Sequence, residues 1–250
     1  MINIIRNVLK KGFFLVMVKK LLKRSEKNNS ILATKWAESK VKLTTTEFCQ
    51  NIDKKQYVET VSEVARIKED AKTKLSYLKF PLGGGGNYFL LYFLVRKFCP
   101  KITIETGVAA GWSSLSILRA LHKNKVGKLY SSDFPYFRIK NPEKLIGILV
   151  QKEPNLKDWI LDIRGDDIAL LDFAKKLDDS SVDLFHYDSD KSYSGRRKAF
   201  QVMKNKFSKD AIIIFDDIQT DLYFFDLVSD TGNNFHVLKF EGKYIGILGL

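Results

Sequence analysis

Cysteine, histidine and proline are scarce in this chain, and no apolar run is long enough to cross a membrane. Among its 250 residues are two cysteines, three histidines and five prolines. Cys49 and Cys99 lie far apart and belong to no CxxC pair, so neither a disulfide framework nor a Cys/His zinc site is supported. A reducing cytoplasm is therefore the expected compartment. Internal repeats are also missing, and the hydrophobic content of 45% is that of an ordinary globular protein.

Acidic residues are absent from residues 1–24, which hold seven Lys and Arg. The rest of the chain carries 35 basic and 29 acidic residues, so over half of the net charge of +13 lies in this arm. That distribution argues against a nucleic-acid partner for the protein as a whole. Gly12 to Val18 is too short an apolar run to span a bilayer, and the arm is predicted to form a basic amphipathic helix. Packing on the body or on a second subunit of a homodimer is favoured over a peripheral contact with an anionic membrane, and both stay open.

Residues 1–80 are predicted to form an N-terminal helical extension. The polar, weakly patterned segment 25–50 indicates a linker that can contain a short helix. From Lys54 to Leu78 apolar residues recur at helical spacing opposite a charged face, which predicts an amphipathic helix. Together with the polar segment, this helix is expected to build a lid over a substrate.

Residues 81–250 are predicted to form one α/β domain. Asn87 is placed to cap a buried helix from Tyr88 to Phe98, which Pro100 ends. After it, apolar β-rich runs alternate with helical patterns, and the runs are continuous enough for a parallel sheet covered on both faces. Two further β runs around a Gly-containing turn predict a terminal antiparallel hairpin at 235–240 and 244–248. The predicted strands are 101–106, 128–133, 158–164, 182–188 and 210–216, and the predicted helices are 112–122, 142–152, 167–177, 192–206 and 219–228. The fold class is thus a doubly wound, mostly parallel seven-stranded sheet with an antiparallel hairpin at its end.

A glycine-bounded loop follows the first of these strands. The chain passes from Glu105 through Gly107 and Gly111 into a patterned helix. Gly107 permits a sharp turn, and Gly111 permits close approach of the backbone to a ligand or a neighbouring element. The amides that open the helix, from Gly111 to Ser114, form an anion site strengthened by the helix dipole. This loop predicts a nucleotide-like or carboxylate-bearing ligand at the carboxyl edge of the sheet.

Each of the five predicted parallel strands ends in an acidic residue. The carboxyl ends of such strands line the ligand crevice, so the acids at these five strand ends form one constellation: Glu105, Asp133, Asp166, Asp188 with Asp190, and Asp216 with Asp217. Asp133 suits the vicinal hydroxyls of a ribose, although a turn or cap aspartate fits the spacing equally well. Asp188, Asp216 and Asp217 leave adjacent strand ends, so their oxygens are predicted to converge on one divalent cation such as Mg²⁺.

Three segments carry a resemblance to a known family. The run from Glu105 to Ser114 resembles the first motif of class I S-adenosylmethionine-dependent methyltransferases, in the form found in their small-molecule O-methyltransferase branch. The run from His186 to Tyr193 is similar to that branch's Asp-x-Asp-(His/Lys)-x-x-Tyr segment, and Phe215-Asp216-Asp217 is similar to its metal-binding acid pair. The likeness covers about residues 81–250. The Asp-Asp pair looks more like enzymes of the macrocin type, which methylate sugar hydroxyls, than like the catechol and caffeoyl-CoA types.

The resemblance implies a Rossmann-like fold, S-adenosylmethionine as methyl donor and Mg²⁺ or a similar ion as cofactor. It implies that the methionine part is held by Glu105, Gly107, Gly111 and Ser113, with the Gly83–Gly86 loop closing over it. It places Asp133 at the ribose, Asp166 near the adenine, and Asp188, Asp216 and Asp217 at the metal. The base that deprotonates the acceptor is Asp190 or Lys191, and the resemblance leaves that choice open. His186 precedes the site on a strand and is expected to be packed rather than catalytic.

The predicted function is O-methylation of a hydroxyl on a small molecule such as a sugar, polyol or phenol. An RNA or protein methyltransferase is the alternative among enzymes, but no (Asn/Asp)-Pro-Pro-(Tyr/Phe) segment follows the fourth strand. A non-catalytic membrane- or partner-binding protein on the same fold is a further alternative, and the intact acid set argues against it. A nicotinamide oxidoreductase fits least, because the loop is Gly-x-x-x-Gly rather than Gly-x-Gly-x-x-Gly.

Overall fold

A computed structural model describes residues 29–78, 82, 84–134, 136, 140–151, 153, 156–232 and 234–250, together with Asn3, Arg6, Asn7, Phe14 and Val18. The predicted amphipathic arm over 1–24 therefore lies almost wholly outside the described residues. Within the described part, none of the helices combines the length and the apolar character that a membrane crossing requires.

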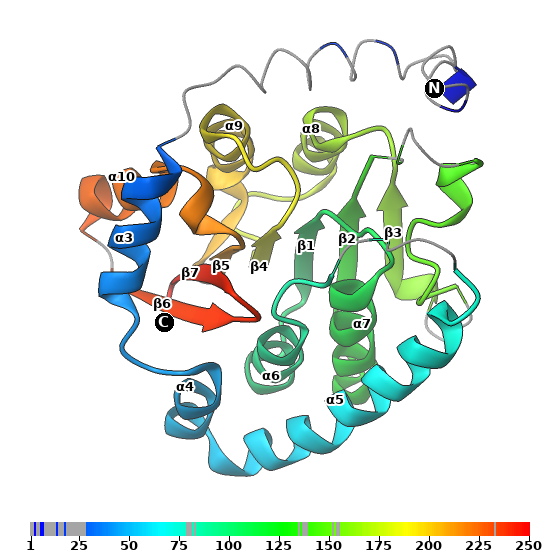
Figure 1. The fold of residues 1–250 in the computed structure, drawn as a ribbon, viewed down its shortest axis with the longest axis horizontal. Coiled ribbons are helices and arrows are strands. Elements are labelled where there is room, and N and C mark those ends of the chain that lie inside the picture. The colour runs from blue at the N-terminus through cyan, green and yellow to red at the C-terminus, as the bar shows by residue number, and fades with distance from the viewer. Residues whose placement is uncertain are drawn as a thin grey trace.

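A seven-stranded sheet forms the centre of the molecule, with the strand order β3-β2-β1-β4-β5-β7-β6 (Figure 1). Its first five strands pair in parallel and follow the predicted positions: β1 Ile102–Thr106, β2 Lys128–Ser132, β3 Trp159–Asp162, β4 Val182–Tyr187 and β5 Phe207–Phe215. The closing hairpin of β6 (Phe235–Phe240) and β7 (Lys243–Leu248) is antiparallel, and β7 also pairs antiparallel with β5. The predicted fold class is confirmed.

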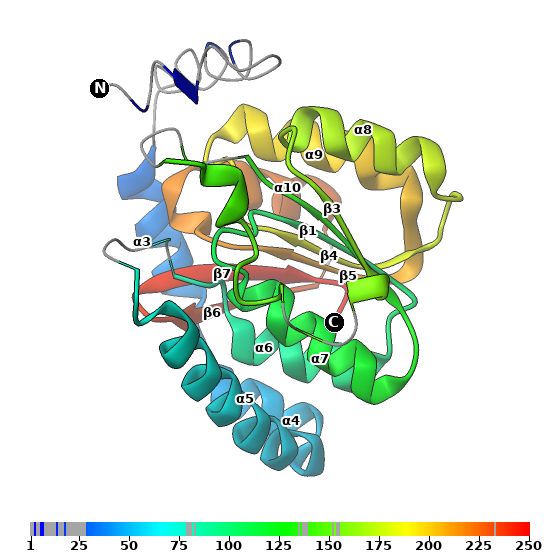
Figure 2. The ribbon, with the colours of Figure 1, turned by 90° about the vertical axis from the view of Figure 1, so that its right-hand side faces the viewer.

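Helices cover both faces of this sheet, and each face has its own apolar core (Figure 2). One face is covered by α5 (Lys54–Leu75), α6 (Tyr88–Phe98) and α7 (Trp112–Asn124), whose side chains share a core with Leu184 and Ile214. The other is covered by α8 (Asp166–Lys176), α9 (Tyr193–Met203) and α10 (Tyr223–Thr231), around Phe185 and Phe215. This double cover explains why the strands read as continuous apolar runs.

The prediction of a linker over 25–50 is wrong, because two helices lie there. Helix α4 (Thr45–Ile52) begins at a capping box, in which the Glu47 amide donates to the Thr44 hydroxyl at 3.2 Å and the Thr44 amide donates to the Glu47 carboxylate at 2.8 Å. Helix α3 (Ser30–Lys40) buries only Ala33 and Ala37 on its contact face, so its apolar stripe is weak. The sequence pattern did not reveal α3 because small residues bury little area.

The predicted helix at 142–152 is also wrong. A single 3₁₀ turn at Pro142–Lys144 is followed by further turns. The amides of Gly147 and Leu149 donate to the carbonyl oxygens of Ala109 and Ala110, at 2.9 and 3.0 Å, and Gly147 has a φ of 65°. These amides bond the glycine loop instead of their own helix, so a tertiary contact overrides the local pattern.

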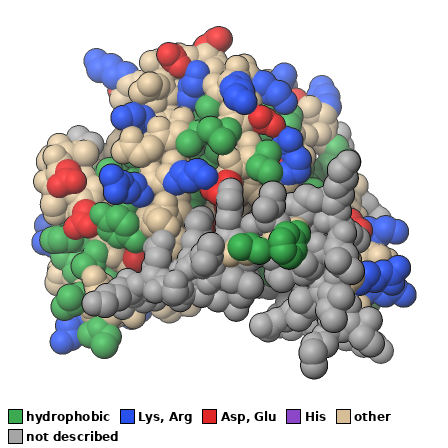
Figure 3. Space-filling model, turned by 90° about the horizontal axis from the view of Figure 1, so that it is seen from above, with side chains coloured by type: hydrophobic (Ala, Val, Ile, Leu, Met, Phe, Trp, Pro, Cys, Tyr) green, Lys and Arg blue, Asp and Glu red, His purple; other side chains and the backbone are tan. Residues whose placement is uncertain are grey.

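The extension packs tightly against the domain. Val64 and Ile67 of α5 belong to the same core as α6 and α7, and Arg96 of α6 pairs with Glu59 of α5 at 2.8 Å. This burial and the ion pair hold α5 against the sheet domain. The role of α5 as part of a substrate lid stays a prediction. On the face seen in Figure 3, the described Lys and Arg side chains lie among hydrophobic and acidic ones.

Candidate active site

The glycine loop joins β1 to α7 through three residues of positive φ, Gly107, Ala109 and Gly111. Gly107 has a φ of 84°, and a Cβ added there would overlap the carbonyl oxygen of Asp188. Gly111 has a φ of 96° directly before the first residue of α7, and a Cβ there would lie 3.0 Å from the Cα of Gly147. Both positions therefore require glycine. The loop is consequently held against the strand end that carries Asp188.

Glu105 lies fully buried beneath this loop. The hydroxyls of Ser114 and Ser131 donate to its Oε2 at 2.6 and 2.8 Å, while its Oε1 has no hydrogen-bond partner among the described residues. Burial raises the pKa of Glu105 to about 7. The neighbouring Ser113 is buried as well. A cationic group of a ligand beside Glu105 would satisfy the remaining oxygen and favour its charged form.

Asp133 directly follows β2, and Asp166 is the first residue of α8. Asp133 accepts hydrogen bonds from the amides of Ala109 and Phe134, at 2.6 and 2.5 Å, so it ties the end of β2 to the glycine loop. Asp166 accepts one from the Ser132 hydroxyl at 2.6 Å. Asp133 therefore borders the glycine loop and Asp166 the end of β2, and their roles at ribose and adenine stay predictions.

A possible metal-binding group lies at the ends of β4 and β5. His186, Asp188 and Asp216 each offer a ligand atom, and these atoms lie within 4.8 Å of one another. Buried Asp216 has its pKa raised to about 7 by desolvation and by the charge of Asp188. Burial lowers the pKa of His186 to about 4, so its imidazole is neutral at pH 7. Neutral imidazole and carboxylate oxygens are ordinary metal ligands, so these residues fit a divalent cation.

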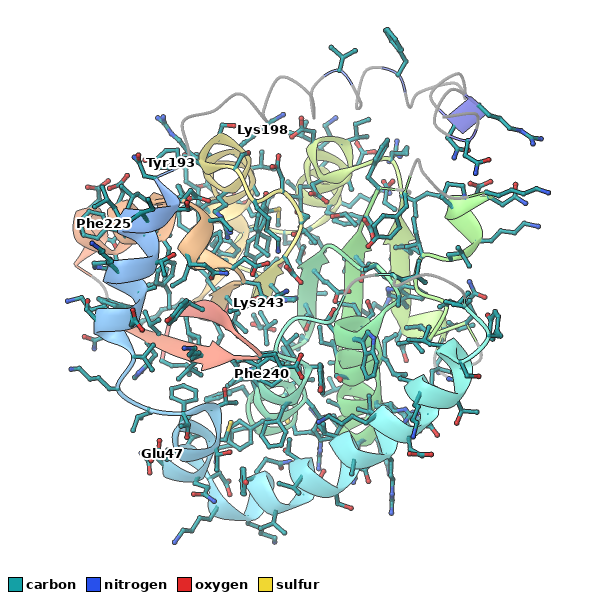
Figure 4. The ribbon with its side chains drawn as sticks, in the orientation of Figure 1. Glu47, Tyr193, Lys198, Phe225, Phe240 and Lys243 are labelled. Atoms are coloured by element: carbon teal, nitrogen blue, oxygen red, sulfur yellow. The ribbon has the colours of Figure 1, made fainter. Side chains whose placement is uncertain are left out.

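Asp217 is held by basic neighbours. Lys191 lies 2.7 Å and Lys243 lies 3.5 Å from its Oδ2, and the Gln219 amide donates to its Oδ1 at 3.1 Å. Lys243 is the first residue of β7 and is labelled in Figure 4. Burial acts to raise the pKa of Asp217, but the two lysines outweigh it, and the net pKa is lowered.

Lys191 also forms an ion pair with Asp188. Burial acts to lower the pKa of Lys191, but Asp188, Asp217 and Asp216 together raise it. In this arrangement the side chain is therefore an ammonium, which cannot accept a proton. The other candidate base, Asp190, accepts the Ser192 amide at 3.2 Å, and a Cβ on Gly195 would lie 2.5 Å from its Oδ2. Its carboxylate thus faces the first turn of α9.

Two residues have a place at the site that the sequence did not predict. Gly86, expected only as part of the loop over the methionine part, approaches the acids so closely that a Cβ there would lie 2.7 Å from Oδ2 of Asp216. Arg196 is fully buried and donates to the carbonyl oxygens of Asp216 and Asp217 at 2.8 and 2.9 Å. The available signal was a charged residue in the apolar stripe of α9, three residues before Ala199.

The comparisons with known proteins agree with this geometry. Residues 104–218 match the family model of a methyltransferase domain, whereas no curated protein sequence matches the chain. A methyltransferase from Podospora anserina, solved with S-adenosylhomocysteine, is 14% identical with a TM-score of 0.57, over 77% of this chain and 96% of its own.

Two O-methyltransferases have the same fold. The Bacillus cereus protein, in complex with S-adenosylhomocysteine, is 13% identical with a TM-score of 0.58, over 74% of this chain and 91% of its own. The Streptomyces achromogenes protein, involved in tomaymycin synthesis and solved with S-adenosylmethionine, is 15% identical with a TM-score of 0.56, over 73% and 88%. The family match begins in β1, before the glycine loop, and ends just after the Asp216-Asp217 pair, so the part of the chain that is similar to a methyltransferase domain includes both of these motifs.

Proposed function

We propose that the protein transfers a methyl group from S-adenosylmethionine to a hydroxyl oxygen of a small molecule, such as a sugar, a polyol or a phenol. The observation that carries the proposal is the direct contact between Gly107 of the loop and the backbone of Asp188. That contact sets the methyl-donor loop beside the acidic cluster. In-line transfer depends on such proximity of donor and acceptor.

The methyl donor is held by residues of the first three strand ends. Glu105, Gly107, Gly111 and Ser113 hold its methionine part, and the unsatisfied oxygen of buried Glu105 suits the ammonium group. Asp133 takes the ribose hydroxyls and Asp166 the adenine. The two O-methyltransferases of the same fold support oxygen as the methylated atom.

The acceptor hydroxyl lies at the acidic cluster. Of the three predicted ligands, Asp188 and Asp216 would hold a divalent cation such as Mg²⁺, while Asp217 beside them is paired with Lys191 and Lys243. The cation, when bound, would lower the pKa of the hydroxyl and fix its position. Asp190 or Lys191 takes the proton. Lys191 can do so once its carboxylate neighbours are neutralised, because those carboxylates are what keep it protonated.

Calorimetric titration of the protein with S-adenosylmethionine, with and without Mg²⁺, tests the proposal. We expect the wild type to bind the methyl donor, and Asp216→Ala to lose the Mg²⁺-dependent part of methyl transfer to a panel of hydroxylated small molecules. Asp210→Ala, an exposed position on the same strand, is the matched control and should behave as wild type. Absence of cofactor binding by the wild type would contradict the proposal.

A further inference from the structure

We propose that His186 is a ligand of the cation, together with Asp188 and Asp216, and that the site prefers Mn²⁺, Fe²⁺ or Co²⁺ to Mg²⁺. The inference rests on the cation site of the proposed function, but it concerns which atoms bind the ion and which ion they select. The sequence suggested that His186 is packed rather than catalytic. The inference makes it a metal ligand instead.

The three side chains are already near the separation that one ion requires. Their ligand atoms lie within 4.8 Å of one another. Two ligands of one ion at about 2.1 Å lie no more than about 4.2 Å apart, so closing around an ion needs side-chain shifts of about 1 Å or less. Shifts of that size need only small rotations of the side chains.

Two ligand atoms face the same point beside Gly86. A Cβ added at Gly86 would lie 2.7 Å from Oδ2 of Asp216 and 2.9 Å from Nε2 of His186. Oδ2 of Asp216 is buried without a hydrogen-bond partner among the described residues, while its Oδ1 accepts the Asp217 amide at 2.9 Å. A buried carboxylate oxygen without a partner is costly unless something binds it. A cation at this point would satisfy it.

His186 is suited to share that ion. Its side chain is 1% exposed, and its Nδ1 also has no hydrogen-bond partner among the described residues. No hydrogen bond from the part of the chain that the structure describes fixes the tautomer, so the proton can lie on Nδ1 and leave the lone pair of Nε2 for a metal. Asp217, by contrast, is already engaged by Lys191, Lys243 and Gln219.

One imidazole nitrogen changes the ion that the site selects. Mg²⁺ prefers oxygen ligands throughout, whereas first-row transition ions accept imidazole together with carboxylates. A set of one nitrogen and two carboxylates therefore favours Mn²⁺, Fe²⁺ or Co²⁺. Lys191 must leave Asp188 when the ion enters, and its remaining partner is Asp217.

Pulsed electron paramagnetic resonance of bound Mn²⁺ tests the inference directly, on full-length protein without a polyhistidine tag. We expect ¹⁴N modulation from a coordinated imidazole in the wild type. His186→Phe should lose this modulation and weaken Mn²⁺ binding by at least about tenfold, whereas His122→Phe, at an exposed histidine, should keep both. Mn²⁺ bound without ¹⁴N modulation would overturn the inference.

A second variant keeps the test valid if His186→Phe does not fold. Gly86→Ala retains all three ligands but fills the point they face, so Mn²⁺ binding should weaken by at least about tenfold. Gly84→Ala, where a Cβ meets nothing within 4 Å, is its control. Wild-type affinity of Gly86→Ala for Mn²⁺ would overturn the inference.

Its failure can be told apart from failure of the proposed function. Suppose that the wild type binds no Mn²⁺, yet binds S-adenosylmethionine and methylates a hydroxyl in the presence of a chelator. This result would contradict the proposed metal site and support the proposed methyl transfer. If Mg²⁺ displaces Mn²⁺ at equal concentration, the proposed selectivity is wrong.

Discussion

The guanidinium of Arg196 and the carboxylate of Asp221 form a buried ion pair, with Nε and Oδ2 2.9 Å apart. The same guanidinium donates to the carbonyl oxygens of Asp216 and Asp217. The Arg196 guanidinium therefore fixes the backbone of Asp216 and Asp217, two of the three predicted metal ligands. Arg196 is a positioning residue for the site, since its side chain contacts main-chain atoms rather than the cluster itself.

Arg196→Met should destabilise the protein by about 3–5 kcal/mol, because it leaves the Asp221 carboxylate buried without its partner. It should also weaken divalent cation binding, since the Asp216-Asp217 segment loses two hydrogen bonds. Urea unfolding and a cation titration measure the two effects. Arg197→Lys, at the exposed neighbouring position, should change neither. Unaltered cation affinity in a folded Arg196→Met protein would show that the pair serves stability alone.

Glu105 predicts a pH-dependent stability of the cofactor-free protein. Its pKa in the folded state is about 7, above the ordinary value of 4.5, so the folded protein binds the extra proton between these two values. Stability from this group is therefore present at low pH and lost as pH rises toward 7, on the order of 3 kcal/mol in total. Urea unfolding at pH 5 and pH 8 should show this loss in the wild type. The loss should be smaller in Glu105→Gln, where the part due to Asp216, whose pKa is also raised to about 7, remains. Exposed Glu69→Gln is the control and should follow the wild type.

The two candidate bases should differ in their effect on catalysis. Lys191→Met should lower kcat by about 10² to 10⁴-fold, the usual contribution of a general base. Asp190→Asn should cost less, because its carboxylate faces α9 rather than the cluster. Cation affinity should increase in Lys191→Met, since the competing ammonium is gone. Steady-state kinetics at saturating cation decides between the two, and a larger loss in Asp190→Asn would reverse the assignment.

Gly107→Ala should abolish binding of S-adenosylmethionine. The added Cβ would overlap the carbonyl oxygen of Asp188, and the φ of 84° disfavours any side chain. Gly232→Ala is a matched control, because Gly232 has a φ of 62° but nothing within 4 Å of an added Cβ. It should lose only about 1 kcal/mol of stability and keep its cofactor affinity, as calorimetric titration can show. Equal losses in both variants would mean that backbone strain alone is responsible.

The sequence was sufficient for the sheet and for the order of the acids along it. The run at 211–215 is apolar and buried because helices cover both faces of the sheet, and that local pattern survives in the sequence. The acids could be placed because parallel strands end at one edge, so their positions follow from topology alone. Asn87 could be assigned as a cap, and its side chain accepts the Leu90 amide at 3.0 Å.

Contacts between segments far apart in the sequence could not be predicted from local sequence patterns. The closeness of Gly86 to His186 joins positions 100 residues apart, and no local pattern encodes it. The same holds for the segment after Pro142, whose amides bond the glycine loop. Which carboxylate of the Asp216-Asp217 pair forms ion pairs with lysines depends on Lys191 and on Lys243, which comes from the terminal hairpin. Tertiary packing determines these contacts, so the adjacent residues Asp216 and Asp217 have different partners.

The anchoring of Asn87 has a consequence for how this kind of protein can diversify. Its side chain donates to Thr45 of the extension at 2.9 Å, directly after the Gly86 that lies against the cluster. Lys243 enters the site from the opposite flank, and both flanks lie outside the matched residues 104–218. Changes in these two flanking segments can therefore alter which acceptor molecule reaches the cluster without any change in residues 104–218. Exchanging the flanking segments between relatives would then change the acceptor and leave binding of the methyl donor unchanged.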